Sequence, residues 1–241
     1  MRTPIALTLL AALSFACGGG HHHHHDDHPP HHGHEEHHRG GEEHAHHHNH
    51  RFTNPEELAQ RWDSPERDAW QRPDVVLEAM AIEPGMTVAD LGAGTGYFVP
   101  HLAKAVGDSG AVLALDVEPK MVSYLAERAQ REGLSQVEAR QVPTTEPGLE
   151  PDSIDRLLTV NTWHHIDRRR DYSLALFKAI KPGGRVVVVD YKREEGIPGA
   201  PMKMRLDPSV VIAELEAGGF EARLVEASLP RQYIVVATRA R

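Results

Sequence analysis

A glycine-rich turn between an apolar strand and a helix constrains the fold of this chain more than any other feature. Residues 88–98 read VADLGAGTGYF, an apolar run that leads into three glycines at alternate positions. Glycine has no Cβ and adopts positive φ, so the backbone can turn sharply there and a ligand can lie directly against it. The dinucleotide fingerprint G-x-G-x-x-G would place its third glycine at position 97, which is Tyr97. A third glycine at Gly96 therefore indicates a nucleotide cofactor of another kind.

The segments that follow alternate between strand and helix patterns. The apolar run 111–116 ends in Asp116, 24 residues after Gly92, where a carboxylate can accept both hydroxyls of a ribose. The next helix is expected over 118–132 with Gly133 as its stop signal, and strands are expected over 153–160 and 180–190, the latter beginning with a helix end and a glycine turn. Strands that alternate with helices predict a mostly parallel sheet covered on both faces.

A helical segment is expected before the first strand, over residues 54–82. Asn54 and Pro55 with Glu57 form a helix start, and the sequence SPER at 64–67 repeats this device. Two interpretations of this segment stay open. It forms a lid over the cofactor, or Trp62, Trp70 and the apolar stripe at 75–80 simply pack on the sheet.

The C-terminal part predicts a helix and two late strands. The helix is expected from residue 207 or 208 to 217, and the strands over 220–225 and 232–238. The connection between these strands is too short for a crossover helix, so the final strand should be antiparallel.

Three motifs, in the right order, resemble those of the class I S-adenosylmethionine (SAM) methyltransferases. They are the apolar pair, acid and G-x-G-x-G of 88–96, the acid Asp116, and the sequence IKPGG at 180–184, which is similar to the family signature L-K-P-G-G. The resemblance covers about residues 73–239. It implies an α/β fold with a doubly wound, mostly parallel seven-stranded sheet, and SAM-dependent methyl transfer to a small-molecule acceptor. Within the family, the chain is similar to quinone-pathway and arsenite methyltransferases, and residues 68–71 (DAWQ) resemble exported bacterial methyltransferase-like proteins.

The resemblance also implies which residues bind SAM. The expected contacts with its amino acid end are made by Asp90, Gly92, Ala93, Gly94 and Gly96. Asp116 is expected to bind the ribose, and Asn161 to accept from the ammonium through its side-chain or its backbone carbonyl. The family's Gly-Asp after strand three is missing, since residues 141–146 read QVPTTE. The residue that contacts adenine is therefore left open among positions 144–146.

The candidate catalytic residues follow strands four and five. His164 and His165 lie just beyond strand four, at the open carboxyl end of the sheet where ligands bind in such folds. One of them could take a proton from an acceptor hydroxyl or amine, because the reference pKa of histidine is close to neutral pH. The alternative is that a histidine here caps the next helix or packs against Trp163. Asp190, at the end of strand five, is the further candidate.

The first 50 residues contain little material for a core, so the expected globular domain spans 51–241. Residues 1–16 resemble a bacterial lipoprotein signal peptide, with Arg2, a short apolar run and small residues before Cys17. Cys17 is the only cysteine, and lipid attachment would give it a purpose. The chain is therefore expected to be exported and held on a membrane by a lipid anchor alone. Ordinary cleavage near Ala16, or a cytoplasmic chain, is the alternative.

A histidine-rich tether is expected over residues 17–50. Residues 21–50 hold 16 of the 19 histidines, interleaved with acids, prolines and glycines, a composition from which no packed structure follows. Neutral imidazole binds Zn, Ni or Cu, so weak metal binding is expected here, first at the run His21, His22, His23, His24 and His25. A solvated tether without a metal role is the alternative.

The balance of charged residues and the expected export limit the classes of function that fit this sequence. Residues 51–241 carry 24 basic and 29 acidic residues, which argues against a nucleic-acid groove, and the RRR run at 168–170 is flanked by acids.

Two other functions compete with the enzyme. They are a membrane-tethered metal-binding lipoprotein, and a degenerate module that keeps the fold but binds another ligand. Export favours both, because SAM is made in the cytosol. Neither the acceptor nor the oligomeric state follows from the sequence.

Overall fold

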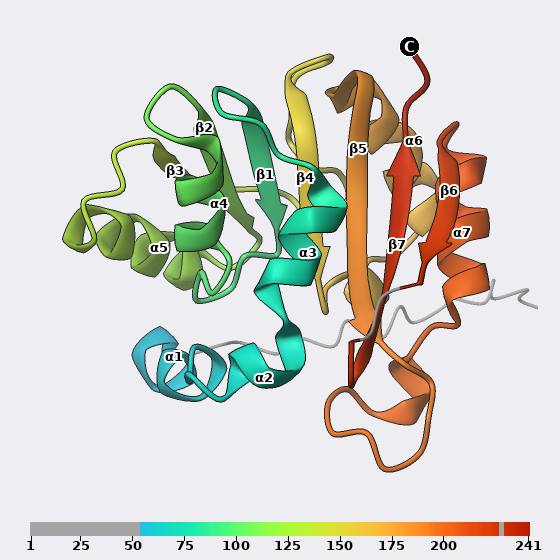
Figure 1. Ribbon diagram of the computed structural model, residues 1–241, viewed down its shortest axis with the longest axis horizontal. Coiled ribbons are helices and arrows are strands. Elements are labelled where there is room, and N and C mark those ends of the chain that lie inside the picture. Colours follow the sequence, from blue (N-terminus) through green and yellow to red (C-terminus); the bar gives the residue numbers. More distant parts are fainter. Residues whose placement is uncertain (1–53, 227–228) are drawn as a thin grey trace, which may run out of the picture. The chain divides into compact units, whose positions relative to one another are not determined.

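The computed structural model of the 241-residue chain describes residues 54–226 and 229–241. Seven strands form one sheet in the order β3-β2-β1-β4-β5-β7-β6 (Figure 1). The strands are β1 (Thr87–Leu91), β2 (Ala111–Asp116), β3 (Val137–Gln141), β4 (Ile154–Val160), β5 (Ile180–Tyr191), β6 (Glu221–Val225) and β7 (Gln232–Thr238). The helices are α1 (Pro55–Trp62), α2 (Arg67–Gln71), α3 (Pro73–Met80), α4 (Val99–Val106), α5 (Pro119–Arg131), α6 (Arg169–Ala179) and α7 (Pro208–Ala217), with short 3₁₀ turns η1 (Trp163–His165) and η2 (Met202–Met204).

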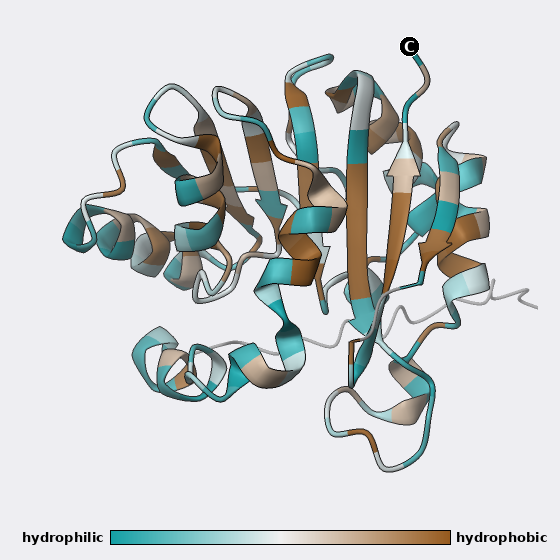
Figure 2. Ribbon diagram, viewed as in Figure 1, coloured by the Kyte–Doolittle hydropathy of each residue, from teal (hydrophilic) through white to brown (hydrophobic). Residues whose placement is uncertain are grey.

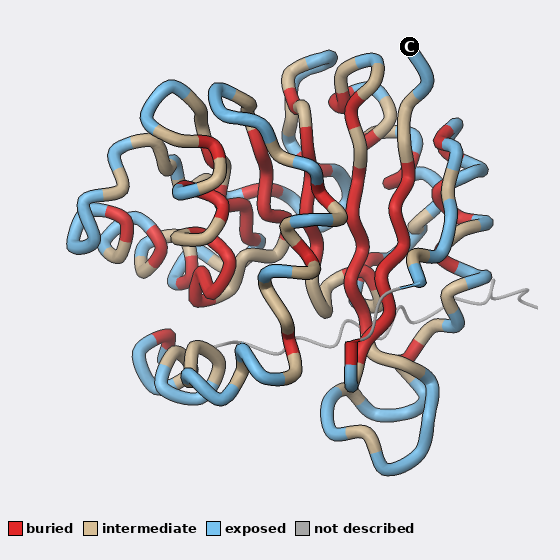
Figure 3. Tube along the Cα trace, in the orientation of Figure 1, coloured by how far each residue is buried: buried red, intermediate tan, exposed pale blue. Residues whose placement is uncertain are grey.

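The predicted sheet is confirmed, including its antiparallel end. The first five strands, β1 to β5, are parallel to one another, whereas β7 runs antiparallel to both β5 and β6. The central strands are buried on both faces, as the valine run 186–189 in β5 requires (Figures 2 and 3). Helices cover the sheet on both sides. Val76 of α3 and Leu102 of α4 pack on one face, and Leu176 of α6 and Leu215 of α7 pack on the other.

The sequence correctly predicts the start of α1 but not that of α2. The side chain of Asn54 accepts a hydrogen bond from the Glu57 N–H at 3.3 Å, so α1 starts where its capping residue predicts. The second expected start is wrong. α2 begins at Arg67 after Glu66, which makes no capping hydrogen bond, because the Ser64 hydroxyl donates to the Glu66 carboxylate instead.

The boundary between α6 and β5 also differs from the prediction. The strand already begins at Ile180, and the glycine turn forms an irregular stretch within it. Gly183 adopts φ +80° and donates its N–H to the Arg239 carbonyl at 2.8 Å, while the Lys181 ammonium pairs with Asp155 at 2.8 Å. These contacts with the chain on both sides keep the stretch in the sheet. No helix in the described part of the chain is long and apolar enough to cross a bilayer.

Candidate functional site

The predicted site residues meet at the carboxyl ends of β1, β2, β4 and β5. The chain order reverses between β1 and β4, which pair directly in the middle of the sheet. In open α/β sheets, such a switch point is where loops diverge and leave a crevice for a ligand. The loop after β4 reaches the glycine loop after β1, since the Thr162 hydroxyl donates to the Gly92 carbonyl at 3.5 Å. The two loops therefore form one site.

The glycine loop needs glycine for distinct reasons at its three positions. Gly92, Gly94 and Gly96 all have positive φ, at +75°, +58° and +88°. A Cβ at Gly92 would lie 2.3 Å from the Thr162 hydroxyl oxygen, and one at Gly96 would lie 2.7 Å from a Leu125 methyl. At Gly94, a Cβ would meet only the Trp62 ring, at 3.6 Å. Packing thus requires glycine at the first and third positions, whereas a Cβ at the second position would make only an ordinary contact with Trp62.

Asp116 closes this site on the β2 side. Its carboxylate accepts the Gly94 N–H at 2.9 Å and the Glu118 N–H at 3.0 Å. Burial raises the pKa of Asp116, and these backbone hydrogen bonds oppose the rise. Val117, directly after it, is 40% exposed and presents apolar surface that a flat ring could cover. Ala93 lies within the same loop and donates its N–H to the Leu115 carbonyl at 3.0 Å.

Asp90 is a buried acid at the end of β1. It is 4% exposed, and no ion pair or hydrogen bond to its carboxylate is found among residues 54–226 and 229–241. Burial raises its pKa to about 7, the positive charge of Arg67 opposes that rise, and the Asp116 carboxylate adds to it. A buried carboxylate without a close cation is well placed to receive one from a ligand.

His164 and Asp190 form a buried pair between the ends of β4 and β5. The His164 Nδ1 lies 2.8 and 2.9 Å from the two carboxylate oxygens of Asp190, and the two side chains are 2% and 1% exposed. Because a carboxylate only accepts, Nδ1 is the donor, and in this tautomer the lone pair of an imidazole lies on Nε2. The backbone N–H of Tyr191 also donates to Asp190, at 2.8 Å, which fixes the carboxylate.

Of the two structural alternatives for the histidines, a helix cap and packing against Trp163, the structure contradicts the cap. α6 has Arg168 as its N-cap, so neither histidine caps it. The fully buried Trp163 donates its indole N–H to Glu214 at 3.0 Å. His165 is exposed, and its ring centre lies 4.2 Å from that of His164. His164 is therefore the predicted histidine that the Asp190 carboxylate holds in a buried position.

Asn161 ends β4 in a left-handed conformation, with φ +55°. Asparagine is one of the few residues that tolerate this region, and such residues cluster at functional sites. Its side-chain oxygen already accepts the Gln232 amide at 2.7 Å. A second lone pair remains on this oxygen, so both ways in which Asn161 was expected to meet an ammonium stay open.

The helical segment before β1 packs partly on the sheet and partly on the glycine loop. α3 packs on the sheet through Val76 and Met80, which are fully buried. α1 and α2 instead contact the glycine loop. The Thr95 hydroxyl donates to Asp63 at 2.8 Å, and the hydroxyl of Tyr97 donates to Asp68. Asp63 also pairs with Arg128 of α5 at 2.6 Å.

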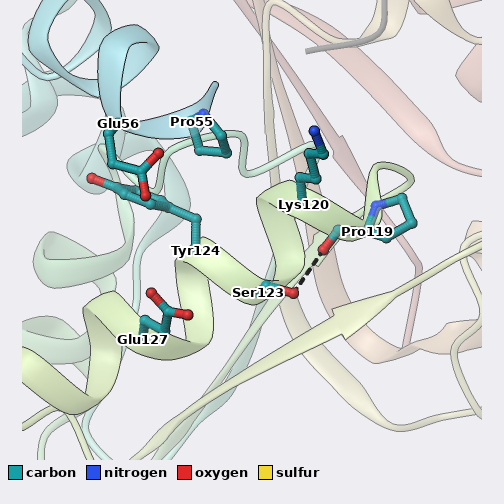
Figure 4. A pocket seen from close by; sticks show the side chains of 7 residues that line it. All are labelled: Pro55, Glu56, Pro119, Lys120, Ser123, Tyr124 and Glu127. Carbon is teal, nitrogen blue, oxygen red and sulfur yellow. Dashed lines mark hydrogen bonds between the residues drawn. The ribbon is translucent and has the colours of Figure 1, made fainter. Parts of the chain in front are cut away.

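A separate shallow hollow lies between the first turns of α1 and α5. It measures about 360 Å³ and is lined by Pro55, Glu56, Pro119, Lys120, Ser123, Tyr124 and Glu127 (Figure 4). The Glu56 carboxylate lies beside the Tyr124 ring, and the Ser123 hydroxyl donates to the Pro119 carbonyl at 3.1 Å. None of the glycine-loop residues lines this hollow, so it is distinct from the site at the sheet edge.

The residues predicted to bind a metal or to carry a lipid belong to the N-terminal part of the sequence. Cys17 and the run His21–His25 lie outside the described residues. Within the described residues, no group of three or more histidine, cysteine or acidic side chains could hold a metal ion.

Residues that sequence reasoning missed come from distant segments. Thr162 packs against Gly92, and Gln71 and Gln232 are fully buried and hydrogen-bonded to each other at 2.7 Å. These two glutamines are 161 positions apart, and no local pattern marks them as partners.

Comparison with known proteins identifies the family. A family described as "Methyltransferase domain" matches residues 82–218. A SAM-dependent methyltransferase from Aquifex aeolicus has the same fold with a TM-score of 0.71 and 30% identity, covering 77% of this chain and 98% of that protein. The chain belongs to the SAM-dependent methyltransferases.

Two curated relatives differ in the reactions that their names give. The ubiquinone/menaquinone biosynthesis C-methyltransferase UbiE of Hydrogenovibrio crunogenus is 29% identical over 125 residues, 52% of this chain and 48% of that protein. Phosphoethanolamine N-methyltransferase 1 of Arabidopsis thaliana is 32% identical over 125 residues, 52% of this chain and 25% of its own length. The chain thus spans about half or less of these curated relatives. Neither relative supports the alternative of a metal-binding lipoprotein.

Proposed function

We propose that the chain transfers the methyl group of SAM to a hydroxyl or amine of a small molecule, with His164 as general base. The observation that carries this proposal is the buried His164–Asp190 pair, at 2.8 Å, on the same sheet edge as the glycine loop and Asp116. SAM supplies an electrophilic methyl group and leaves as S-adenosylhomocysteine.

The residues of this chain do the positioning and the proton transfer. The half-buried backbone of Gly92, Ala93 and Gly94 and the Asp90 carboxylate are suited to the amino acid end of SAM, with Asp90 toward its ammonium. Asp116 has acceptor oxygens for the ribose hydroxyls, and Val117 offers a flat apolar surface beside it. Nε2 of His164 takes the acceptor's proton as its oxygen or nitrogen bonds to the methyl carbon. Asp190 then stabilises the imidazolium that forms.

The function is tested by incubating the full chain with SAM that carries a labelled methyl group and a panel of small phenols, alcohols and amines. We expect labelled product and S-adenosylhomocysteine in equal amounts with at least one hydroxyl or amine acceptor. Product methylated at carbon alone would contradict the role of His164 as a base for a hydroxyl or amine.

SAM affinity should depend on pH through Asp90. With a pKa of about 7 in the free protein, this carboxyl is protonated below pH 7 and then cannot attract the ammonium. Affinity should rise with pH and level off above about 8, with a loss of about thirtyfold at pH 5.5 for a group of this pKa. Calorimetry from pH 5.5 to 8.5 measures this, and Asp90→Asn should bind weakly with a flat profile. An unchanged slope in that variant would assign the dependence to another group.

We propose further that the domain of residues 51–241 is exported and tethered to a membrane surface through lipid on Cys17, after removal of residues 1–16. The support is the sequence pattern alone. Cys17→Ser should move the protein from the membrane fraction to the soluble fraction of a bacterial host that makes lipoproteins. Wild-type protein found soluble in the cytosol, with Met1 still attached, would contradict the tether.

The tract 21–50 is proposed to bind Zn, Ni or Cu reversibly and independently of the methyltransferase site. Imidazole with a reference pKa of about 6.5 loses its metal-binding lone pair on protonation, so affinity should fall steeply between pH 7.5 and 5.5. Saturating Zn should leave the SAM dissociation constant of the full chain unchanged. A tenfold change, about 1.4 kcal/mol of coupling, would show that the tract regulates the domain.

A further inference from the structure

Arg67 of α2 is a half-buried cation that faces the glycine loop. Its guanidinium lies 3.9 Å from the centre of the Tyr97 ring. It donates to the Trp62 carbonyl at 2.8 Å and to the Gln71 side-chain oxygen at 3.1 and 3.3 Å. Both partners are neutral, and Arg67 forms no ion pair within the part of the chain that the structure describes. A guanidinium has five N–H donors, so donors remain for an anion.

The position of Arg67 is fixed by a one-way chain of buried amides. Gln71 donates to Gln232 at 2.7 Å, Gln232 donates to Asn161 at 2.7 Å, and Asn161 donates to the Tyr191 hydroxyl at 3.4 Å. Because a guanidinium can only donate, Arg67 sets the direction of every amide after it. This series of hydrogen bonds connects α2 to the ends of β4 and β5 and fixes the position of the Arg67 guanidinium.

The charges on the two sides of the glycine loop are complementary to those of an amino acid. Asp90 is buried without a close cation. The charge of Arg67 acts on Asp90, where it opposes the rise in pKa that burial causes. An amino acid tail carries an ammonium and a carboxylate on one carbon, so it would place one charge near each of these groups. On the proposed function, the tail at this place is the methionine part of SAM.

We propose that Arg67 binds the carboxylate of SAM. Through this contact α2 recognises the amino acid tail, and the same contact holds α2 over the bound cofactor. Arg128, the other cation that contacts the glycine loop, already has carboxylate partners. It pairs with Asp63 at 2.6 Å and with Glu132 at 2.8 Å. Tyr97 supports this role, because it fills the third-glycine position of a dinucleotide loop with the ring on which Arg67 stacks.

The test compares two ligands that differ only in the carboxylate. They are S-adenosylhomocysteine and its decarboxylated analogue, which keeps the ammonium, and both are titrated calorimetrically into the full chain. Wild-type protein should prefer S-adenosylhomocysteine by about tenfold to a hundredfold, as a charge-assisted hydrogen-bonded pair provides. Arg67→Met should abolish the preference by weakening S-adenosylhomocysteine alone. Arg67→Lys should keep part of it, and Arg61→Met, an exposed cation on α1, should keep all of it.

The possible results separate this inference from the function on which it rests. If Arg67→Met and Arg67→Lys weaken both ligands by the same factor, Arg67 has only a structural role and the inference is overturned, while the proposed function stands. If wild-type protein binds both ligands equally, the carboxylate does not contribute to binding and the inference fails. If wild-type protein binds neither ligand, the proposed function fails as well.

Discussion

Gly94→Val is expected to abolish SAM binding, with at least a hundredfold loss of affinity, while the sheet stays folded. At Gly94, a Cβ meets only the Trp62 ring at 3.6 Å, so the fold has room for it. A branched side chain would nevertheless stand on the surface of the loop where the cofactor must approach the backbone. The φ of +58° adds about 1–2 kcal/mol of strain, which lowers the melting temperature by a few degrees.

Gly133→Val is the matched control for this prediction. Gly133 has a similar φ of +68°, ends the α5 helix, and has nothing within 4 Å of a Cβ. The control should lose a similar amount of stability and bind SAM like the wild type. Calorimetry with SAM and thermal unfolding are measured on both variants. SAM affinity that survives in Gly94→Val would remove the glycine loop from the cofactor site.

His164→Gln should lower kcat by about 10² to 10⁴, the usual contribution of a general base, without changing the SAM dissociation constant. Glutamine fills much of the same space but cannot accept a proton at neutral pH. Asp190→Asn should also lower kcat, because an amide can donate to Nδ1 and so favours the tautomer that protonates Nε2. Both variants are assayed with an acceptor found in the labelled-methyl screen.

His165→Gln is the control, since His165 is exposed whereas the His164 side chain is buried against Asp190. We expect its turnover to stay within a few fold of the wild type. If His165→Gln loses as much activity as His164→Gln, the base has been assigned to the wrong histidine. If neither variant loses activity, methyl transfer proceeds without a histidine base.

The fold could be predicted because its signals are local. The apolar runs of the strands, the glycines at 92, 94 and 96, and the short link before β7 each determine structure within a few residues. The exceptions are boundaries decided by distant contacts. Ser64 does not cap α2 because its hydroxyl bonds Glu66, and Ile180 joins β5 because the chain beside it pairs with Asp155 and Arg239.

The candidate site was predictable only where it lies on strand ends. His164 and Asp190 follow neighbouring parallel strands, whose register pairs Val160 with Val189, so sequence reasoning could select both residues. It could not show that their side chains meet. Arg67 and Gln232 lie in no motif, Gln71 lies in the DAWQ segment without a role assigned to it, and the partners of all three depend on how α2 and β7 pack against the edge of the sheet. For residues far apart in the sequence, the direction in which a side chain points is determined by tertiary packing, so no short sequence pattern predicts it.

The most direct test of the account is a calorimetric titration of the full chain with SAM and, separately, with NAD. Tyr97 stands where a dinucleotide loop needs its third glycine, and its ring packs beneath Arg67 at 3.9 Å. We therefore predict one molar equivalent of SAM bound per chain, competed by S-adenosylhomocysteine, and no heat of binding with NAD. Binding of NAD without binding of SAM would contradict the assignment of the glycine loop, of Asp116 and of the methyl-transfer function built on them.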